Sequence, residues 1–297
     1  MAKGRELKGR IRSVENTRKI TRTMEMVATS KMKRATDRVA SARPYAIALG
    51  EMLRHVYSPE LAEQFPLLRR PAQQRRVALL ILTANRGLSG AFNSNLIKEA
   101  RARIAELEAR GATVELHIVG KKGIGFFRYL GKPMLTQRTD ITDKPSAADA
   151  ASLVDDLMAR FASGELDAVY VTATKFKSAL STPPGTEMVL PVTPPVSAAA
   201  AVTTGAPVTG SPMRDFILSP SPVEILEALL PAYVRNAVYR ALVETEAGFQ
   251  SAQRTAMKNA TDNATEILQT LKRTYNSARQ AQITQEIAEI VGGAAAL

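Results

Sequence analysis

The sequence predicts an α/β fold with a long helical extension. In this fold an antiparallel coiled coil of the N- and C-terminal helices accompanies a small α/β domain with a mainly parallel sheet. Both ends of the 297-residue chain are long stretches with helical apolar spacing and very little proline or glycine. The middle alternates short apolar runs with amphipathic segments, which is typical of helices covering a parallel sheet.

We therefore divide the chain into four regions. A coiled-coil helix is expected at 1–57, an α/β domain at 75–193, a flexible loop at 194–222, and a second coiled-coil helix at 223–297. Residues 58–76 hold three prolines and are interpreted as a linker.

Composition removes several classes of function. The chain has no cysteine, which excludes disulfides, thiolate metal sites and cysteine nucleophiles. With only two histidines, a histidine-based metal site is nearly excluded as well. No run of eighteen apolar residues occurs, and the N-terminus lacks the apolar core of a signal peptide, so the protein is expected to stay on the cytoplasmic side.

The first helix is expected from the absence of proline between residues 3 and 43, with Pro44 as a stop or kink. A ladder of apolar residues spaced by three and four runs along it, but positions 18, 21 and 25 are Arg, Thr and Glu. There Ile20, Met24 and Val27 carry the apolar stripe, so we expect the seam to change face in mid-helix. The ladder residues are Leu7, Ile11, Val14, Ala28, Met32, Ala35, Val39, Ala42, Ala46, Leu49 and Leu53.

The same helix holds most of the net charge of +12. Residues 1–43 contain thirteen Lys or Arg and four acids, an excess of nine positive charges, which favours an acidic partner. Nucleic acid is one such partner, since these cations would bind phosphates. Against it, aromatic residues are only 5% of the chain, and the apolar seam on this helix indicates a protein partner.

The middle of the chain changes to strand-length apolar runs. Buried strands are expected at 77–83, 114–120 and 168–174, and an edge strand at 186–193. Helices are expected at about 94–110, 124–130 and 147–163. The following loop is rich in Pro, Ala, Thr, Ser and Gly.

The last helix is expected to be too long for a compact domain. Extended back to Pro231, which marks a kink or a second start, it covers about 60 residues, or roughly 90 Å. A helix of that length needs a partner along its side. Its apolar stripe is formed by Ala260, Ala264, Ile267, Leu271, Tyr275 and Ala278.

Two glycine-containing turns are candidate sites. The run GKKGIG at 120–125 follows a strand but matches neither G-x-x-x-x-G-K-[ST] nor G-x-G-x-x-G, so nucleotide binding is disfavoured. The run GLSGA at 87–91 is similar to a nucleophile elbow with its second glycine one place early, so we prefer a tight strand-to-helix turn. His117 is interpreted as a satisfied core histidine and His55 as an interfacial residue.

Both termini resemble the gamma subunit of bacterial F-type ATP synthases. ITQEIAEIVGGAAA at 283–296 matches that family's I-T-x-E-x-x-[DE]-x-x-x-G-A-x-A signature, preceded by ATDNA at 260–264 and YNSARQAQ at 275–282. RIRSVENTRKITRTMEMVATSKMKRA at 10–35, RPYA at 43–46 and TANRGLSGAFN in the middle also follow family motifs. The resemblance spans the chain and is most specific near both termini.

The resemblance implies a central rotor shaft without bond chemistry, cofactor or metal of its own. Its α/β domain would be a foot touching the epsilon subunit and the c-subunit ring, and its C-terminal end would enter a hexamer of alpha and beta subunits. Proton flow would turn the ring and the shaft, coupling to ATP synthesis or hydrolysis at the beta subunits. The protein would be peripheral on the cytoplasmic face of the cell inner membrane, bound only through partner subunits, with no nucleic acid.

The resemblance also implies contact residues for the alpha and beta subunits. On the C-terminal helix Arg279 and Gln280 would face beta-subunit loops, and Thr284 and Glu286 of the signature are further contact residues. On the basic helix Met24 would lie near the beta-subunit lever, and Lys31, Lys33 and Arg34 would oppose acidic surfaces. The resemblance also implies that Arg86, in the TANRG turn, is a contact residue. Asn85 stands where the family often has Asp, and Ser89 where it often has Cys, so no charge role is carried over to position 85.

Overall fold

A computed structural model describes residues 2–57, 64–193 and 221–295. The expected loop at 194–222 lies outside these residues except for its last two positions. The chain forms two compact units: unit 1 comprises residues 1–32, 88–90 and 250–297, and unit 2 comprises residues 33–87 and 91–249. The elements are α1 (Ala2–Val56), η1 (Pro66–Leu68), β1 (Arg76–Leu82), α3 (Phe92–Ala109), β2 (Thr113–Val119), α4 (Lys121–Tyr129), β3 (Thr136–Arg138), α5 (Ala147–Ala162), β4 (Ala168–Thr174), β5 (Pro184–Leu190) and α6 (Pro222–Ala295).

Unit 2 is built on a five-stranded sheet of order β3-β2-β1-β4-β5. β1 pairs in parallel with β2 and with β4, and β2 pairs in parallel with β3, while β5 is antiparallel to β4 at the edge. β4 is buried along its whole length, and β1 everywhere except its first residue, as continuous apolar runs in parallel sheets require. The expected mainly parallel sheet and its edge strand are therefore confirmed.

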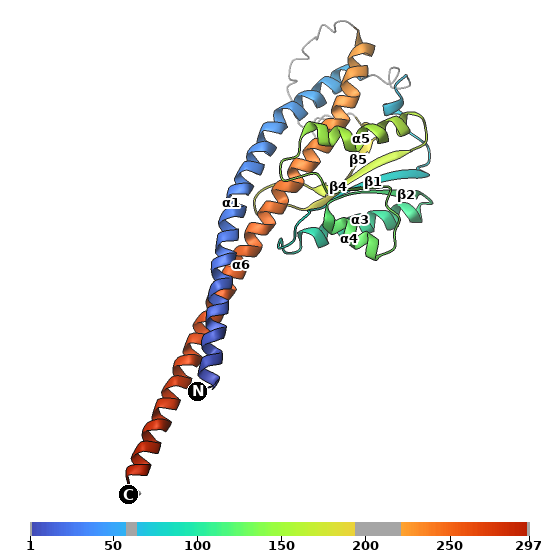
Figure 1. The fold of residues 1–297 in the computed structure, drawn as a ribbon. Coiled ribbons are helices and arrows are strands. Elements are labelled where there is room, and N and C mark those ends of the chain that lie inside the picture. The colour runs from blue at the N-terminus through green and yellow to red at the C-terminus, as the bar shows by residue number, and fades with distance from the viewer. Residues whose placement is uncertain (1, 58–63, 194–220, 296–297) are drawn as a thin grey trace, which may run out of the picture. The chain divides into compact units, whose positions relative to one another are not determined.

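Helices cover both faces of this sheet (Figure 1). On one face α3 and α4 bury Val77, Leu79 and Ile81 of β1. On the other face the alternate residues Ala78, Leu80 and Leu82 join a core with α5, the end of α1 and the beginning of α6. The alternation along one strand thus separates two cores. α5 begins with a capping box in which Ser146 and Asp149 each accept a hydrogen bond from the other's backbone amide.

Unit 1 contains the first part of α1 and the last part of α6, which pair through small buried residues. Thr21 of α1 and Thr261 of α6 are opposite each other, with their Oγ1 atoms 2.8 Å apart. Within unit 2 the same helices share a cluster of Ala35 and Val39 with Val243 and Ala247. Higher residue numbers on α1 meet lower ones on α6, so the two helices are antiparallel, as expected.

The seam of α1 does not change face, and this prediction was wrong. Thr21 is 9% exposed and Ala28 1%, so the ladder continues straight through the threonine, whereas Ile20 and Val27 are 59% and 51% exposed. A polar residue occupies a seam position because Thr261 supplies its hydrogen-bond partner.

On α6 the buried stripe differs in part from the predicted one. Ala264 is buried as predicted, but Leu268 is buried at 3% exposure in place of Ile267, which is 50% exposed. The other buried positions of this part include Met257 and Thr261. Here too a threonine occupies the seam where the sequence pattern favoured an apolar residue.

Neither internal proline interrupts its helix. α1 runs through Pro44 to Val56, and α6 runs through Pro231 from Pro222 to Ala295. The stop at Pro44 and the second start at Pro231 are therefore corrected. Short elements were also missed: β3 has three residues, and η1 lies within the expected linker. Three residues are too few for a periodic signal.

Candidate partner-binding surface

The contact residues predicted on α6 lie in its exposed last turns. Arg279, Gln280, Thr284 and Glu286 are all exposed, and among the described side chains from 279 to 292 only Gln282 is partly buried. Their polar groups are held locally along the helix: Thr284 Oγ1 donates to the Gln280 carbonyl at 2.9 Å, and Gln282 Nε2 donates to Glu286 Oε1 at 2.9 Å. The structure thus groups these four predicted residues on two adjacent turns.

An apolar stripe accompanies these polar residues. Ile283, Ile287 and Ile290 are 46%, 56% and 71% exposed, and Val291 is 61% exposed. Spacings of four and three place the isoleucines on one helical face. We did not single them out in the sequence, although their period was visible within the signature. An exposed apolar stripe of this kind is a candidate interaction surface.

The pairing register of unit 1 explains why this part of α6 is exposed. Thr21 faces Thr261, so in an antiparallel pair each step down α1 corresponds to one step up α6. Ala2, the first residue of α1, then falls opposite Gln280. The part of α6 beyond Gln280 extends past the beginning of α1.

The residues predicted on α1 lie along about three turns. Met24 and Lys31 are half-buried in unit 1, and Lys33 and Arg34 are exposed in unit 2. Arg86 is exposed in the turn after β1. The positive charge of α1 is presented to solvent at many positions, because Arg5, Lys8, Arg10, Arg12, Lys19 and Arg22 are also exposed.

In the α/β domain, backbone groups at the end of β4 form hydrogen bonds with another part of the chain. In an open α/β sheet a nucleotide binds outside the carboxyl ends of the strands, where the strand order reverses. Here that point lies between β1 and β4. The amide of Thr174 donates to Thr245 Oγ1 at 3.2 Å, and the amide of Phe176 donates to Glu244 Oε2 at 3.0 Å. Both acceptors belong to α6, so these two amides at the end of β4 are hydrogen-bonded by the chain itself.

The first turn of α4 is likewise engaged by protein groups. The amide of Lys121 donates to Asn85 Oδ1 at 3.1 Å, and the amide of Lys122 donates to the Ala84 carbonyl at 3.2 Å. The amide of Gly123 donates to Thr83 Oγ1 at 2.9 Å. Gly120 has a positive φ of 99°, and a Cβ there would lie 2.0 Å from the Thr83 carbonyl oxygen. This glycine therefore serves close packing and not a phosphate.

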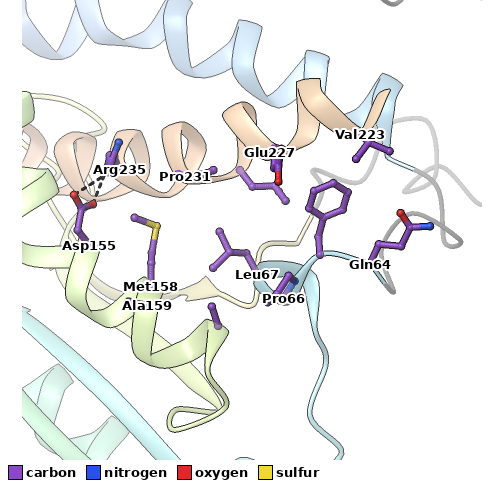
Figure 2. Close-up of a pocket in the computed structure, with 13 residues that line it drawn as sticks. Gln64, Pro66, Leu67, Asp155, Met158, Ala159, Val223, Glu227, Pro231 and Arg235 are labelled. Atoms are coloured by element: carbon purple, nitrogen blue, oxygen red, sulfur yellow. Dashed lines mark hydrogen bonds and ion pairs between the residues drawn. The ribbon is translucent and has the colours of Figure 1, made fainter. Parts of the chain in front are cut away.

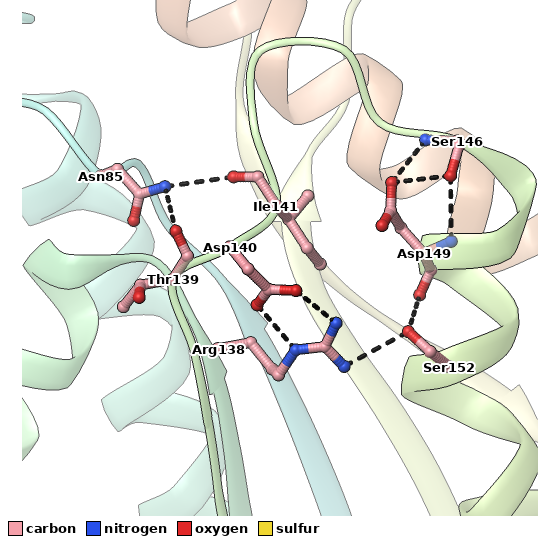
Figure 3. A network of polar contacts seen from close by, with 8 residues as sticks. All are labelled: Asn85, Arg138, Thr139, Asp140, Ile141, Ser146, Asp149 and Ser152. Carbon is pink, nitrogen blue, oxygen red and sulfur yellow. Dashed lines mark hydrogen bonds and ion pairs between the residues drawn. The ribbon is translucent and has the colours of Figure 1, made fainter.

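Asn85 ties three segments together, as Figure 3 shows in part. Its Nδ2 donates to the carbonyls of Thr139 and Ile141, both at 3.1 Å, and its Oδ1 accepts from Lys121. The carbonyls accept only and the amide donates only, so this orientation is fixed by its neighbours. Nearby, Arg138 binds Asp140 through two hydrogen bonds and holds the pKa of that carboxyl at about 2.

The turn at 87–91 does not have the geometry of a nucleophile elbow. Ser89 is only 3% exposed, whereas an elbow presents its serine at the surface of a site. His117 is buried in β2 and its Nδ1 lies 2.9 Å from Thr136 Oγ1, while its Nε2 has no hydrogen-bond partner among the described residues. Burial lowers the pKa of His117. The core histidine is therefore only half satisfied. The other histidine, His55, is exposed.

A cavity of about 480 Å³ lies in unit 2 among η1, α5 and the beginning of α6 (Figure 2). Most of its lining is apolar, including Phe65, Met158 and Leu230. Its polar pair, Asp155 and Arg235, is joined by two hydrogen bonds of 2.7 and 2.9 Å. No group of three or more potential metal ligands occurs in the part of the chain that the structure describes. No described helix is long and apolar enough to span a bilayer.

Comparison with known proteins decides the family. A family model described as ATP synthase matches residues 3–297. The ATP synthase gamma chain of Gemmatimonas aurantiaca is 77% identical over 297 residues, covering 100% of this chain and 99% of that protein. The chain belongs to the ATP synthase gamma-chain family. The gamma chain of Leptospira biflexa is 44% identical, with 100% of both chains covered. The family resemblance in the sequence is confirmed.

Solved structures agree on the fold. The central stalk and c-ring structure of the Tetrahymena thermophila mitochondrial ATP synthase contains a chain that matches with a TM-score of 0.60 and 24% identity, covering 81% of this chain and 99% of that one. A chain in the Euglena gracilis mitochondrial ATP synthase structure (OSCP/F1/c-ring) matches with a TM-score of 0.64 and 19% identity, covering 99% and 94%. Two terminal helices with a mixed, mainly parallel sheet are thus the fold of this family.

Proposed function

We propose that this chain is the central rotor shaft of an F-type ATP synthase, a subunit that transmits torque and performs no bond chemistry itself. The observation that carries the proposal is the end of α6. Beyond Gln280 no described residue of α1 lies opposite the helix, and Ile283, Ile287 and Ile290 are exposed there. Apolar side chains in this arrangement require a surrounding partner. Because the relatives of this chain are ATP synthase gamma chains, we take the alpha and beta subunits to be this partner.

The rest of the chain fits the same scheme. The α/β domain is proposed as the foot, which touches the epsilon subunit and the c-subunit ring. The exposed cations of α1, with Lys31, Lys33 and Arg34 among the contact residues, are proposed to oppose acidic surfaces of the beta subunits. Rotation of an asymmetric shaft would present a different face to each beta subunit and so bias its nucleotide site.

The proposed location is the cytoplasmic face of the cell inner membrane. The chain would be held there through the c-subunit ring, since its own described helices do not supply a membrane span. Proton flow through the membrane sector would turn the ring together with this chain.

Reconstitution tests the proposal directly. Alpha and beta subunits of a bacterial relative are mixed with the purified chain, and ATP hydrolysis is measured with and without it. We expect the ATPase rate to rise well above that of the alpha and beta subunits alone. An unchanged rate, with the chain folded by circular dichroism, would reject the shaft role.

Contact residues are tested in the same assay. Arg279→Ala and Gln280→Ala should lower the stimulated rate, whereas Arg273→Ala is the matched control, since Arg273 is exposed on the same helix but lies in the part that α1 accompanies. Met24, Arg86, Thr284 and Glu286 are tested likewise. Equal rates for all variants would remove these residues from the contact surface while leaving the shaft role intact.

A further inference from the structure

Two buried threonines meet across the helix pair of unit 1. Thr21 and Thr261 are each 9% exposed, and their hydroxyl oxygens are 2.8 Å apart. The buried positions nearest to them are apolar, namely Ala28, Met257, Ala264 and Leu268, whereas farther along α6 in unit 1 the polar residues Gln250 and Ser251 are also buried. The contact between Thr21 and Thr261 is buried, so it is not part of the proposed partner-binding surface.

The two hydroxyls are satisfied by each other and by carbonyls of their own helices. Thr21 Oγ1 lies 3.1 Å from the Arg18 carbonyl, and Thr261 Oγ1 lies 2.9 Å from the Met257 carbonyl. Each hydroxyl has one proton to donate. Thr261 Oγ1 donates to Thr21 Oγ1, and Thr21 Oγ1 donates to the Arg18 carbonyl, so both protons are used and one hydrogen bond joins the two helices. Thr261 Oγ1 is also within hydrogen-bond distance of the Met257 carbonyl.

Between Met257 and Leu268 the other seam contacts define axial position only weakly. Ala28 and Ala264 let the helices come close, but a methyl group is a small knob that fits many holes. Sliding one helix by a turn therefore exchanges similar apolar contacts. The same slide would separate the two hydroxyls and place each against apolar neighbours, so the hydrogen bond favours one register over the others.

We propose that Thr21 and Thr261 are positioning residues that hold α1 and α6 in a single axial register. The inference rests on contacts within unit 1 and not on the rotor function. Its consequence concerns the length of α6 that passes the beginning of α1. A slip of one turn would change that length by about 5.4 Å, and it would shift Met24 relative to the exposed end of α6.

The absence of cysteine from the chain allows a clean test by disulfide mapping. Val14→Cys with Leu268→Cys reports the native register, because these positions lie seven residues from the threonines in opposite directions. Val14→Cys with Ala264→Cys reports a slip of about one turn. The measured quantity is the ratio of slipped to native cross-link in the full chain under mild oxidation.

We expect Thr21→Val with Thr261→Val to raise this ratio about fivefold, the factor that one neutral hydrogen bond provides. The control is Thr23→Val with Thr270→Val, since these exposed hydroxyls bond only their own helices, to the Lys19 and Glu266 carbonyls. The control should leave the ratio unchanged, and Thr21→Ser with Thr261→Ser should keep the native ratio.

The single variants make the test decisive. Either Thr21→Val or Thr261→Val alone removes the bond between the helices, so each should raise the ratio as much as the double variant does. In the double variant both hydroxyls are replaced by methyl groups of the same shape, so the thermal midpoint should stay close to the native value, which separates register from stability. A ratio that equals the control, or single effects that add in the double variant, would overturn the proposal.

Discussion

The two ends of α6 follow the same apolar spacing but have opposite surroundings. Near its beginning Leu226, Leu230 and Val234 are at most 1% exposed within the core of unit 2. Near its end Ile283, Ile287 and Ile290 are 46% to 71% exposed. Similar patterns therefore serve the chain's own fold at one end and another molecule at the other. Amphipathic spacing alone identifies a helix face without saying what covers it.

The largest effect that follows from this comparison is on stability. Leu230→Ala leaves a void in the core beside α5 and should lower the free energy of unfolding by about 2–5 kcal/mol. Ile287→Ala, a deletion of similar size at the exposed end, should change it by less than about 0.5 kcal/mol. Urea unfolding followed by circular dichroism measures both. Similar losses for the two variants would mean that the end of α6 is also part of the folded core.

The next largest effect on the free energy of unfolding is expected at Asn85. Asn85→Asp replaces the amide that donates to the Thr139 and Ile141 carbonyls by a group that only accepts, and the loss should be about 1–3 kcal/mol. Asn95→Asp is the control, because Asn95 is exposed in the first turn of α3, where a carboxylate is tolerated or slightly favourable. Equal urea midpoints for Asn85→Asp and the native chain would show that these hydrogen bonds contribute nothing.

His117 should make the α/β domain sensitive to mild acid. Burial lowers its pKa in the folded state, against opposing effects of Glu115 and Asp156 and an additional lowering by Arg160. A lowered folded pKa gives stability that is complete above the unfolded value near 6.5 and is lost as the pH falls through the folded value. The free energy of unfolding falls by at most about 1.4 kcal/mol for each pH unit.

The chain provides the control for this prediction. Unfolding free energies between pH 7 and 5 should fall less steeply in His117→Gln than in the native chain. His55→Gln should follow the native curve, because His55 is exposed. Parallel curves for all three proteins would contradict the assignment.

The smallest effect is expected at Asp140. Arg138 lowers the pKa of Asp140 to about 2, so the contribution of the pair is complete above the ordinary value of 3.8 and disappears as the pH falls toward 2. The Asp140 side chain is 60% exposed, and solvent screening limits the contribution to less than about 1 kcal/mol. Asp140→Asn should therefore differ from the native chain at pH 6 and match it near pH 2 in urea unfolding. A difference that persists at pH 2 would have another cause.

The layers of this fold could be predicted from the sequence because its apolar patterns repeat over many residues. Both terminal helices and the buried strands give repeated signals over many residues. The seam could not be predicted at Thr21, since a buried hydroxyl is recognised only when its partner 240 residues away is known. Pro44 and Pro231 were each expected to mark a kink or a break, but neither breaks its helix, because tertiary contacts stabilise a helix through a residue that locally disfavours it.

The candidate surface was predicted only in part. Motif resemblance indicated the polar residues around Arg279, and the structure places four of them on exposed turns of α6. Ile283, Ile287 and Ile290 were overlooked, although their spacing is plain, because a buried and an exposed apolar stripe have the same appearance in a sequence. The role of Asn85 as a hydrogen-bond donor required the positions of two carbonyls in another loop.

The most direct test of the account changes the exposed stripe and measures both properties in one protein. Ile283, Ile287 and Ile290 are replaced together by serine, and Ile267→Ser, at a 50% exposed position in the part of α6 that α1 accompanies, is the control. We predict that the triple variant unfolds at the native urea midpoint but binds reconstituted alpha and beta subunits at least tenfold more weakly, while the control binds normally. Native binding by the triple variant would contradict the claim that this end of α6 is the partner surface.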